Sequence, residues 1–248
     1  MRALILGGTG DANRLADRCI REKIDAIYSY AGRTQIPLGH ALPTRIGGFG
    51  GATGLAAFIR EQAITHVIDA THPFAAEMSR HAVEACAETG VPLVALERAP
   101  WVRASGDQWI EVADINAAVA ALPERLTRVF LAIGRQHIAP FAAKAQHAYT
   151  LRFVDALDGP LPLPDAEVIV SRGPFTLEGD RELMRSRGIE FLVARNSGGA
   201  GARAKIDAAR ELGLPVIMIE RPALPDRPRV ESVEEVLAWL SHDARLGA

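Results

Sequence analysis

Short apolar runs alternate with amphipathic stretches along the whole chain, and this alternation restricts the fold more than any other feature. Apolar runs that are each followed by a helical pattern are typical of parallel βα units. The pattern therefore predicts the α/β class, with helices in most intervals and a last helix at about 232–241. We expect strands at 2–6, 25–30, 43–46, 66–70, 92–96, 109–112, 128–133, 149–153, 167–171, 190–194 and 215–219.

Two segments repeat at a nearly constant offset. Residues 88–100 (ETGVPLVALERAP) are echoed by residues 211–222 (ELGLPVIMIERP), an offset of 123 residues, and residues 2–7 resemble residues 128–134 at a similar offset. In the first pair, Gly ends a helix, Pro begins a strand and Glu-Arg closes it. Chance is the alternative explanation, because Gly-x-Pro after a helix is common, but two coincidences favour two similar doubly wound, Rossmann-like domains. The predicted domains are residues 1–123 and 124–248.

Composition restricts the partners of the chain. A net charge of −2 gives no basis for unspecific attraction to nucleic acid or to a membrane surface. No apolar stretch is long enough for a signal peptide or a membrane span. Cys19 and Cys86 lie on apolar faces of separate predicted helices, so we expect buried thiols and neither a disulfide nor a metal site. The sequence thus predicts a cytoplasmic protein without nucleic-acid or membrane partners.

The first predicted strand runs directly into a glycine turn (GGTGDA), and a helix follows at about 11–22. Such a turn lets the backbone approach a pyrophosphate, while the helix N-terminus supplies N–H donors and a positive dipole end. The G-x-G-x-x-G pattern is imperfect, because Asn13 stands where a third Gly or Ala belongs. A plain strand-to-helix turn is the alternative. The candidate pyrophosphate-binding residues are Gly7, Gly8, Thr9, Gly10, Asp11 and Ala12.

The end of the second predicted strand favours NADPH over NADH. Domains of this type place an acid there for the ribose 2′-hydroxyl of NAD and a basic residue for the 2′-phosphate of NADP. Residues 29–34 (SYAGRT) contain no acid, and Ser29, Arg33 and Thr34 supply donors. Arg33 can bind a phosphate with its bidentate fork. The alternative is that Arg33 is a solvated loop residue.

A second candidate loop begins at Asp69 (DATHPFAA). Pro73 biases His72 towards extended backbone geometry, cannot donate a main-chain hydrogen bond and suits the first turn of a following helix. His72 is thus expected to be fixed near the cofactor edge, where it could donate a hydrogen bond or a proton. The alternative is that His72 only caps the next helix.

The repeat aligns this loop with residues 194–199 (ARNSGG), so both loops should lie at the carboxyl edge of a sheet, where α/β domains bind ligands. The backbone of Asn196–Gly199 could cradle a carboxylate, a phosphate or the nicotinamide amide, with a plain linker as the alternative. Cations follow the nearby strand ends and together suit a ligand with several carboxylates, although each one singly is more often a surface residue. They are Arg135, His137, Arg172, Arg195 and Lys205.

Several catalytic motifs are missing from the sequence. It has no Tyr-x-x-x-Lys dyad, P-loop, Gly-x-Ser-x-Gly or clustered Cys/His metal spacing. Covalent and metal-dependent catalysis are therefore not expected. An enzyme of this kind would work mostly by positioning a cofactor against a substrate.

Taken together, the motifs resemble the precorrin-6A reductase family of cobalamin biosynthesis. They span almost the whole chain in the family's order, and DATHPFA together with NSGG is the most specific combination. The matching segments are GGTGDA (7–12), SYAGR (29–33), DATHPFA (69–75), GPF (173–175) and RNSGGAGARAKIDAARELGLPVIMIERP (195–222).

The resemblance implies an NADPH-binding first domain, a tetrapyrrole-binding second domain and an active site in the cleft between them. It implies hydride transfer from NADPH to one ring double bond of precorrin-6A, giving precorrin-6B, with a proton added at the neighbouring carbon. The acetate and propionate carboxylates of this anionic substrate would pair with the cationic loops, and transient contact with neighbouring pathway enzymes is a further expectation. Metal-free and cobalt-containing substrates both stay open.

The resemblance also suggests a role for each candidate residue. The glycine turn would hold the pyrophosphate, Ser29 and Arg33 the 2′-phosphate, and Asp69, Ala70 and Thr71 the nicotinamide side. His72 would be the catalytic proton donor, with solvent as the alternative. The expected substrate-binding residues are Phe74, Arg135, Arg172, Arg195, Asn196, Ser197, Gly198, Gly199 and Lys205.

Two departures from the family pattern bear on these roles. Similar proteins usually have Lys before Asn-Ser-Gly, whereas this chain has Arg195. The charge is kept, but a guanidinium stays protonated and cannot act as a proton donor in catalysis. Asp11 stands where Glu is frequent.

Two rival functions are also compatible with the sequence. One is an NADP-linked oxidoreductase or isomerase of the extended short-chain type, which the missing Tyr/Lys dyad disfavours. The other is a non-catalytic NADPH-sensing module whose second half binds a protein, against which the cationic loops count.

Overall fold

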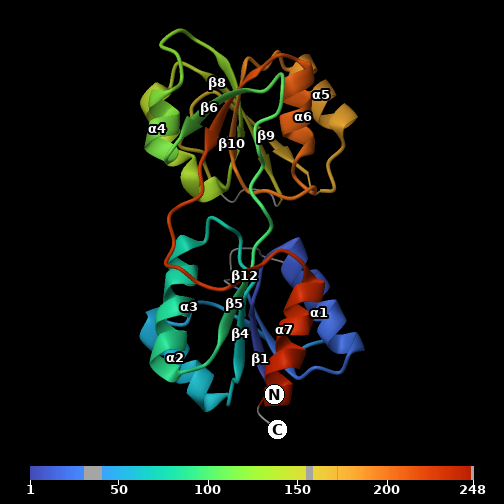
Figure 1. Ribbon diagram of the computed structural model, residues 1–248. Coiled ribbons are helices and arrows are strands. Elements are labelled where there is room, and N and C mark those ends of the chain that lie inside the picture. The colour runs from blue at the N-terminus through green and yellow to red at the C-terminus, as the bar shows by residue number, and fades with distance from the viewer. Residues whose placement is uncertain (31–40, 155–158, 172, 247–248) are drawn as a thin grey trace. The chain divides into compact units, whose positions relative to one another are not determined.

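The computed structural model describes residues 1–30, 41–154, 159–171 and 173–246 (Figure 1). The chain divides into two compact units, and each is described on its own. Unit 1 consists of Met1–Ala99 and Ala223–Ala248, and unit 2 consists of Pro100–Pro222.

Unit 1 contains a parallel six-stranded sheet in the order β12-β5-β4-β1-β2-β3. This is the 3-2-1-4-5-6 order of a dinucleotide-binding doubly wound fold, with β12 in the sixth place. The strands are β1 (Ala3–Leu6), β2 (Ala26–Tyr30), β3 (Thr44–Ile46), β4 (His66–Asp69), β5 (Leu93–Leu96) and β12 (Arg229–Val230). The helices are α1 (Gly10–Arg21), α2 (Gly51–Glu61), α3 (Ala76–Thr89) and α7 (Val233–Leu246).

Alternate side chains of the strands in unit 1 enter two different cores. On β1, Ala3 and Ile5 pack with residues of α1 and α7, whereas Leu4 and Leu6 pack with residues of α2 and α3. Figure 1 shows these two helix pairs on opposite faces of the sheet. Because both faces are covered, β1 is apolar along its whole length, as central strands of parallel sheets commonly are.

Unit 2 repeats this strand order as β6-β11-β10-β7-β8-β9, again with parallel pairing. In Figure 1, α5 and α6 cover one face of this sheet and α4 lies on the other. The strands are β6 (Gln108–Val112), β7 (Arg128–Ala132), β8 (Ala148–Phe153), β9 (Ala166–Val170), β10 (Phe191–Arg195) and β11 (Pro215–Ile219). The helices are α4 (Ile115–Ala120), α5 (Leu177–Ser186) and α6 (Ala204–Glu211).

The crossover after β7 differs from its counterpart in unit 1. Where β1 leads into the α-helix α1, β7 leads into two 3₁₀ helices, η1 (Arg135–His137) and η2 (Ala139–Lys144). Short 3₁₀ turns build up little macrodipole. The glycine turn of unit 1 therefore precedes a stronger anion-binding helix terminus than the corresponding turn of unit 2.

The two units exchange their sixth strands. After β5 the chain leaves unit 1, and β6 pairs with β11 of unit 2. After β11 it returns, and β12 pairs with β5 of unit 1. The repeated Glu-Arg pairs, at 97–98 and 220–221, directly precede the two crossings.

This division differs from the predicted domains 1–123 and 124–248. Residues 100–123 belong to unit 2, and the segment from Ala223 onwards belongs to unit 1. The periodicity of a segment predicts a strand but carries no information about the sheet that the strand joins, which is why the boundary was misplaced. The ligands assigned to the two domains stay predictions.

The sequence located the elements well. Each predicted strand has a counterpart within one or two residues at its ends, and only the short β12 was not predicted. Cys19 and Cys86 are free and buried as expected, and burial raises their pKa values to about 11 and about 12. Within the described residues, no helix has the length and apolar character needed to cross a membrane.

A buried histidine directly precedes β8, away from the carboxyl edge of the sheet. His147 is fully buried, and neither ring nitrogen has a hydrogen-bond partner among the described residues. Its ring packs edge-on against Tyr149, with centroids 5.9 Å apart. Desolvation, helped by the charge of Lys144, lowers the pKa of His147 below its ordinary value of 6.5. The imidazole is therefore neutral in the folded protein.

We expect His147 to make the protein less stable in acid. Its pKa is lowered by folding, so the unfolded chain binds the extra proton as the pH falls below about 6.5, and stability is lost in that range. In His147→Phe the decline in the free energy of unfolding between about pH 7 and pH 5 should become shallower, as measured by urea unfolding at each pH. His242→Phe, at an exposed position on α7, should keep the wild-type slope. An unchanged slope in His147→Phe would contradict the prediction.

Candidate active site

Doubly wound sheets bind ligands at the carboxyl edge, beside the point where the strand order reverses. That point lies between β1 and β4 in unit 1 and between β7 and β10 in unit 2. The segments singled out in the sequence follow these strands: residues 7–12 follow β1, residues 70–75 follow β4, and residues 196–199 follow β10. Their predicted positions in the two sheets are confirmed.

Thr9 joins the two candidate loops of unit 1. It is the N-cap of α1, where its Oγ1 accepts a hydrogen bond from the Ala12 N–H (3.1 Å). The same hydroxyl donates to the Ala70 carbonyl (2.9 Å), and the Ala70 N–H donates to the Leu6 carbonyl (2.9 Å). The glycine turn is therefore fixed against the loop that leads to His72.

Tyr28 explains the imperfect glycine pattern. A Cβ on Gly7 would lie 2.1 Å from Cζ of the Tyr28 ring, so only glycine fits beneath this ring. The Tyr28 hydroxyl accepts from the Gly8 N–H (2.9 Å) and donates to Oδ1 of Asn13 (2.8 Å). Asn13 thus has a partner of its own at the position where other domains use a third glycine for close packing. Gly8 has a φ of 107°, which also requires glycine.

An acid and two arginines lie at the N-terminus of α1. Asp11 forms an ion pair with Nη1 of Arg98 (2.8 Å) and a second one with Arg14. An isolated carboxylate here would oppose an anionic ligand, but the two guanidinium groups leave the local charge positive. Together with the N–H groups of the first helical turn, which have no carbonyl partner within the helix, this arrangement fits a pyrophosphate.

The strand β2 is described to its last residue, Tyr30, and residues 31–40 lie outside the described part of the chain. Ser29 is buried, and its Oγ accepts a hydrogen bond from Nη1 of Arg45 on β3 (3.0 Å). Arg33, the residue expected to bind the 2′-phosphate, lies outside the described residues. Arg45 was not identified from the sequence.

Asp69 fixes the loop after β4. Its Oδ1 accepts from the N–H (3.2 Å) and the hydroxyl (2.6 Å) of Thr71, and its Oδ2 accepts from the Ser79 hydroxyl (2.6 Å). The carboxylate is buried, and in the structure it has a local structural role. The predicted contacts of Asp69, Ala70 and Thr71 with the nicotinamide stay predictions.

A buried arginine from the returning segment packs beside Asp69. Arg227 has only 6% of its side chain exposed; its Nη2 donates to Glu97 (2.8 Å) and its Nε lies 3.9 Å from Oδ2 of Asp69. These three charged residues line a small cavity together with His72. Arg227 joins this site only because residues 223–248 return to unit 1, so the sequence pattern did not reveal it.

His72 is held by a main-chain contact. Its Nδ1 accepts from the Phe74 N–H (3.2 Å), and the two rings lie 5.8 Å apart. With Nδ1 acting as an acceptor, the neutral ring carries its proton on Nε2. The N-cap of α3 is Ala75, which has no side-chain hydrogen bond, so His72 does not cap this helix directly.

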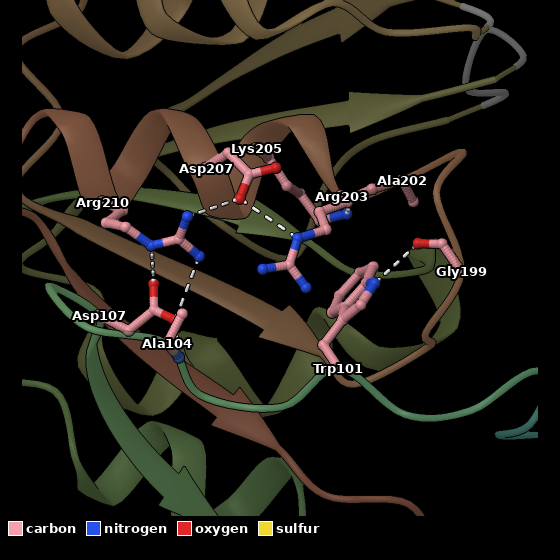
Figure 2. Close-up of polar contacts among 9 residues, drawn as sticks. All are labelled: Trp101, Ala104, Asp107, Gly199, Ala202, Arg203, Lys205, Asp207 and Arg210. Carbon is pink, nitrogen blue, oxygen red and sulfur yellow. Dashed lines mark hydrogen bonds and ion pairs between the residues drawn. The ribbon is translucent and has the colours of Figure 1, made fainter.

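In unit 2, Trp101 holds the Asn-Ser-Gly-Gly loop through hydrogen bonds. Oδ1 of Asn196 accepts from the Trp101 N–H (2.7 Å), and Nδ2 of Asn196 donates to the Trp101 carbonyl (2.9 Å). Figure 2 shows the indole Nε1 donating to the Gly199 carbonyl (2.7 Å). The amide of Asn196 therefore holds the loop, and its predicted contact with substrate is not tested by this geometry.

Arg221 binds the same loop from the end of β11. Its Nε donates to the Asn196 carbonyl (3.0 Å) and its Nη2 to the Ser197 carbonyl (3.2 Å). Gly198 and Gly199 follow with φ values of 68° and 71°, a conformation that side chains rarely adopt. The loop is thus a well-defined turn rather than a plain linker.

Lys205 is more buried than a surface cation would be. Only 6% of the residue is exposed, and Nζ donates to the Ala202 carbonyl (2.6 Å) and lies 5.1 Å from the centre of the Trp101 ring. Figure 2 shows it beside Trp101 at the start of α6. Burial of an ammonium is costly unless hydrogen bonds and ring contacts of this kind replace its hydration.

A charge network supports the connection that carries Trp101 (Figure 2). Asp107 accepts hydrogen bonds from Nε of Arg210 (2.8 Å) and from the Ala104 N–H (2.7 Å). Burial opposes ionisation, but these hydrogen bonds prevail and lower the pKa of Asp107 below its ordinary value. Arg210 and Arg203 also share the Asp207 carboxylate on α6.

Two of the remaining predicted cations lie where strands of this sheet end. Arg135 is exposed on η1, and Arg195 is the half-buried last residue of β10. Arg172 lies outside the described residues. Their predicted role in binding carboxylates stays a prediction.

The repeat contained a signal that could have identified two of the missed residues. Arg98 and Arg221 occupy equivalent positions in the two Glu-Arg pairs, and both hold a candidate loop of their own unit. Trp101 and Tyr28 gave no such signal, because their contacts depend on tertiary packing.

Two doubly wound units, one with a glycine turn before a helix N-terminus, define an α/β protein of the dinucleotide-binding class. Among the described residues no group of His, Cys, Asp and Glu side chains could hold a metal ion.

Comparisons with known proteins identify relatives along almost the whole chain. The family model described as Precorrin-6x reductase CbiJ/CobK matches residues 2–241. Precorrin-6A reductase of Rhodobacter capsulatus is 57% identical over 240 residues, which cover 97% of this chain and 96% of the relative. Cobalt-precorrin-6A reductase of Priestia megaterium is 32% identical over 254 residues, 98% of this chain and 99% of the relative.

A solved structure titled "CobK precorrin-6A reductase" has a TM-score of 0.94 at 57% identity and covers 98% of this chain and 96% of that one. The chain therefore belongs to the precorrin-6x reductase family, and the predicted family, α/β fold and oxidoreductase class are confirmed.

We expect Gly7→Ala to displace the Tyr28 ring and break its hydrogen bonds to Gly8 and Asn13. Overpacking of this kind costs about 1–3 kcal/mol in the free energy of unfolding, which urea titration would measure. Gly10→Ala is the control, because its Cβ would meet nothing closer than Nη1 of Arg14 at 3.9 Å. Combining Gly7→Ala with Tyr28→Ala should cost less than the sum of the two changes. Full additivity would show that the ring is not the obstacle.

Proposed function

We propose that this protein uses NADPH to reduce a ring double bond of precorrin-6A, giving precorrin-6B. The observation that carries the proposal is the 57% identity to a precorrin-6A reductase across almost the full length of both chains. When bound, NADPH supplies a hydride for one carbon of the double bond, and a proton must reach the neighbouring carbon. The residues of the chain bind and orient the two reactants.

Unit 1 is the proposed cofactor unit. Its glycine turn leads into an α-helix, whereas the equivalent turn of unit 2 leads into 3₁₀ turns. Gly8 and the first turn of α1 would face the pyrophosphate, and Arg98 and Arg14 would offset the charge of Asp11. Ser29 and Arg33 would bind the 2′-phosphate.

Unit 2 is the proposed tetrapyrrole unit. The substrate carries several acetate and propionate carboxylates, and this edge of the sheet offers half-buried and buried cations, above all Arg195 and Lys205. Arg135 is exposed and Arg172 would add to the set. The turn at Ser197–Gly199 would bind the substrate within this unit, and Phe74 of unit 1 stays a predicted substrate contact.

His72 is the proposed proton donor. Because the Phe74 N–H occupies Nδ1, the proton available for transfer lies on Nε2. Arg195 cannot take this role, since a guanidinium does not release a proton. Solvent is the alternative donor.

The degree of similarity favours the metal-free substrate. The Rhodobacter capsulatus relative named for precorrin-6A is 57% identical, whereas the Priestia megaterium relative named for cobalt-precorrin-6A is 32% identical. We also predict a cytoplasmic location and transient contact with the enzymes that precede and follow this step.

We expect the purified protein to oxidise NADPH when precorrin-6A is added without oxygen, and to oxidise NADH much more slowly. The loss of absorbance at the reduced nicotinamide band measures both rates. Faster oxidation with the cobalt-containing form would reverse the substrate assignment. No oxidation with either form, while NADPH is shown to bind, would overturn the proposed reaction.

We expect His72→Ala to lower turnover by about a hundredfold or more, the usual contribution of a general acid, with little change in NADPH affinity. Single-turnover rates and a fluorescence titration of NADPH separate the two effects. His242→Ala, exposed on α7, is the matched control. Wild-type turnover in His72→Ala would leave solvent as the proton donor.

A further inference from the structure

A half-buried arginine stands beside the carboxyl end of β2. Arg45 on β3 is the register partner of Ser29 on β2, so the two side chains lie next to each other on one face of the sheet. The carboxyl end of β2 is where a doubly wound domain distinguishes the substituents of the adenosine ribose.

The guanidinium of Arg45 is held rigidly. Nη1 donates to Ser29 Oγ (3.0 Å) and to the Gly47 carbonyl (2.8 Å), and Nη2 donates to the Gly48 carbonyl (3.0 Å). Its central carbon lies 3.8 Å from the centre of the Phe49 ring. Of the five N–H donors of an arginine, two therefore remain for a ligand in a fixed orientation.

This cation has no counter-ion in the described part of the chain. Burial alone lowers the pKa of Arg45, with no carboxylate acting against it. By contrast Arg98, Arg210 and Arg227 each have a carboxylate oxygen at 2.8 Å.

The sequence around Arg45 also lacks acidic residues. Residues 26–60, which include β2, β3 and most of α2, contain no Asp or Glu at all. A half-buried guanidinium in a segment without acids is an incomplete ion pair, and an anionic ligand would complete it.

Ser29 gains a defined orientation from the same contact. Its Oγ already accepts a hydrogen bond from Arg45, so its own proton is left to be donated. The hydroxyl is buried, and no acceptor for this proton is present among the described residues. The pair thus offers two kinds of donor, a hydroxyl and a fixed guanidinium.

We propose that Arg45 determines the preference for a 2′-phosphate, by supplying its counter-charge and by orienting the Ser29 hydroxyl towards it. This inference rests on the proposed use of NADPH and adds a residue that the sequence pattern did not identify. Arg45 acts on cofactor choice and not on the chemical step.

The test compares two ligands that differ only in the 2′-phosphate: adenosine 2′,5′-bisphosphate and adenosine 5′-monophosphate. Isothermal titration calorimetry gives both dissociation constants for wild type, Arg45→Met, Arg45→Lys and Arg60→Met. Arg60 is the matched control, since it lies exposed on α2 and pairs with Glu88.

In Arg45→Met we expect the preference for the bisphosphate to fall by about tenfold or more, the contribution of a charge-assisted hydrogen bond, while the monophosphate affinity is kept. Arg45→Lys should keep part of the preference, because the charge stays but the fork is lost. Arg60→Met should behave as wild type. Arg45→Lys also provides the comparison if the methionine variant does not fold.

The calorimetry distinguishes a failure of the proposed role of Arg45 from a failure of the proposed use of NADPH. A wild-type preference that Arg45→Met and Arg45→Lys retain in full would overturn the role of Arg45 and leave NADPH use standing. An equal loss of affinity for both ligands would show that Arg45 only supports the turn at Gly47 and Gly48. No wild-type preference for the bisphosphate would overturn NADPH use itself, and the inference with it.

Discussion

Each sheet of this protein is completed by a strand from the other half of the sequence, and the rest of the structure depends on this pairing. β12 covers the edge of β5 in unit 1, and β6 covers the edge of β11 in unit 2. The return of the chain also brings α7, whose Val236 and Leu240 are fully buried against α1 and β1. Neither half of the chain therefore contains a complete unit, and unit 1 is complete only after the chain has returned to it.

The crossings also bring polar side chains to the carboxyl edges of the sheets. Trp101, just after the first crossing, forms hydrogen bonds with the Asn-Ser-Gly-Gly loop. Arg227, just after the second crossing, forms ion pairs with Asp69 and Glu97 beside His72. Several residues that the sequence suggests as ligand-binding residues form hydrogen bonds within loops in the structure. The amide of Asn196 and the carboxylate of Asp69 are examples. Main-chain N–H groups and the cations at these edges stay the proposed binding groups.

The distribution of charge separates supporting arginines from candidates for ligand binding. Arginines that form ion pairs with carboxylates at short distance, such as Arg210 with Asp107, tie elements together. Arg45 differs because its partners are neutral oxygens and an aromatic ring. A guanidinium that is oriented and has no carboxylate partner in the described part of the chain suits an anion, and its place beside β2 supports the proposed role at the ribose end of a dinucleotide.

The sequence by itself determined the α/β class, the strands and helices, the loops at the carboxyl edges and the family. It could do so because strand and helix periods, glycine turns and contiguous motifs are local properties of the chain. Only the tertiary structure decided that residues 109–112 join the second sheet and that Asn13 accepts a hydrogen bond from Tyr28. It also decided which further side chains belong to the candidate sites, namely Arg45, Arg98, Trp101 and Arg227. Strand pairing and side-chain contacts between distant segments depend on which surfaces fit together in three dimensions, and a one-dimensional pattern does not encode that choice.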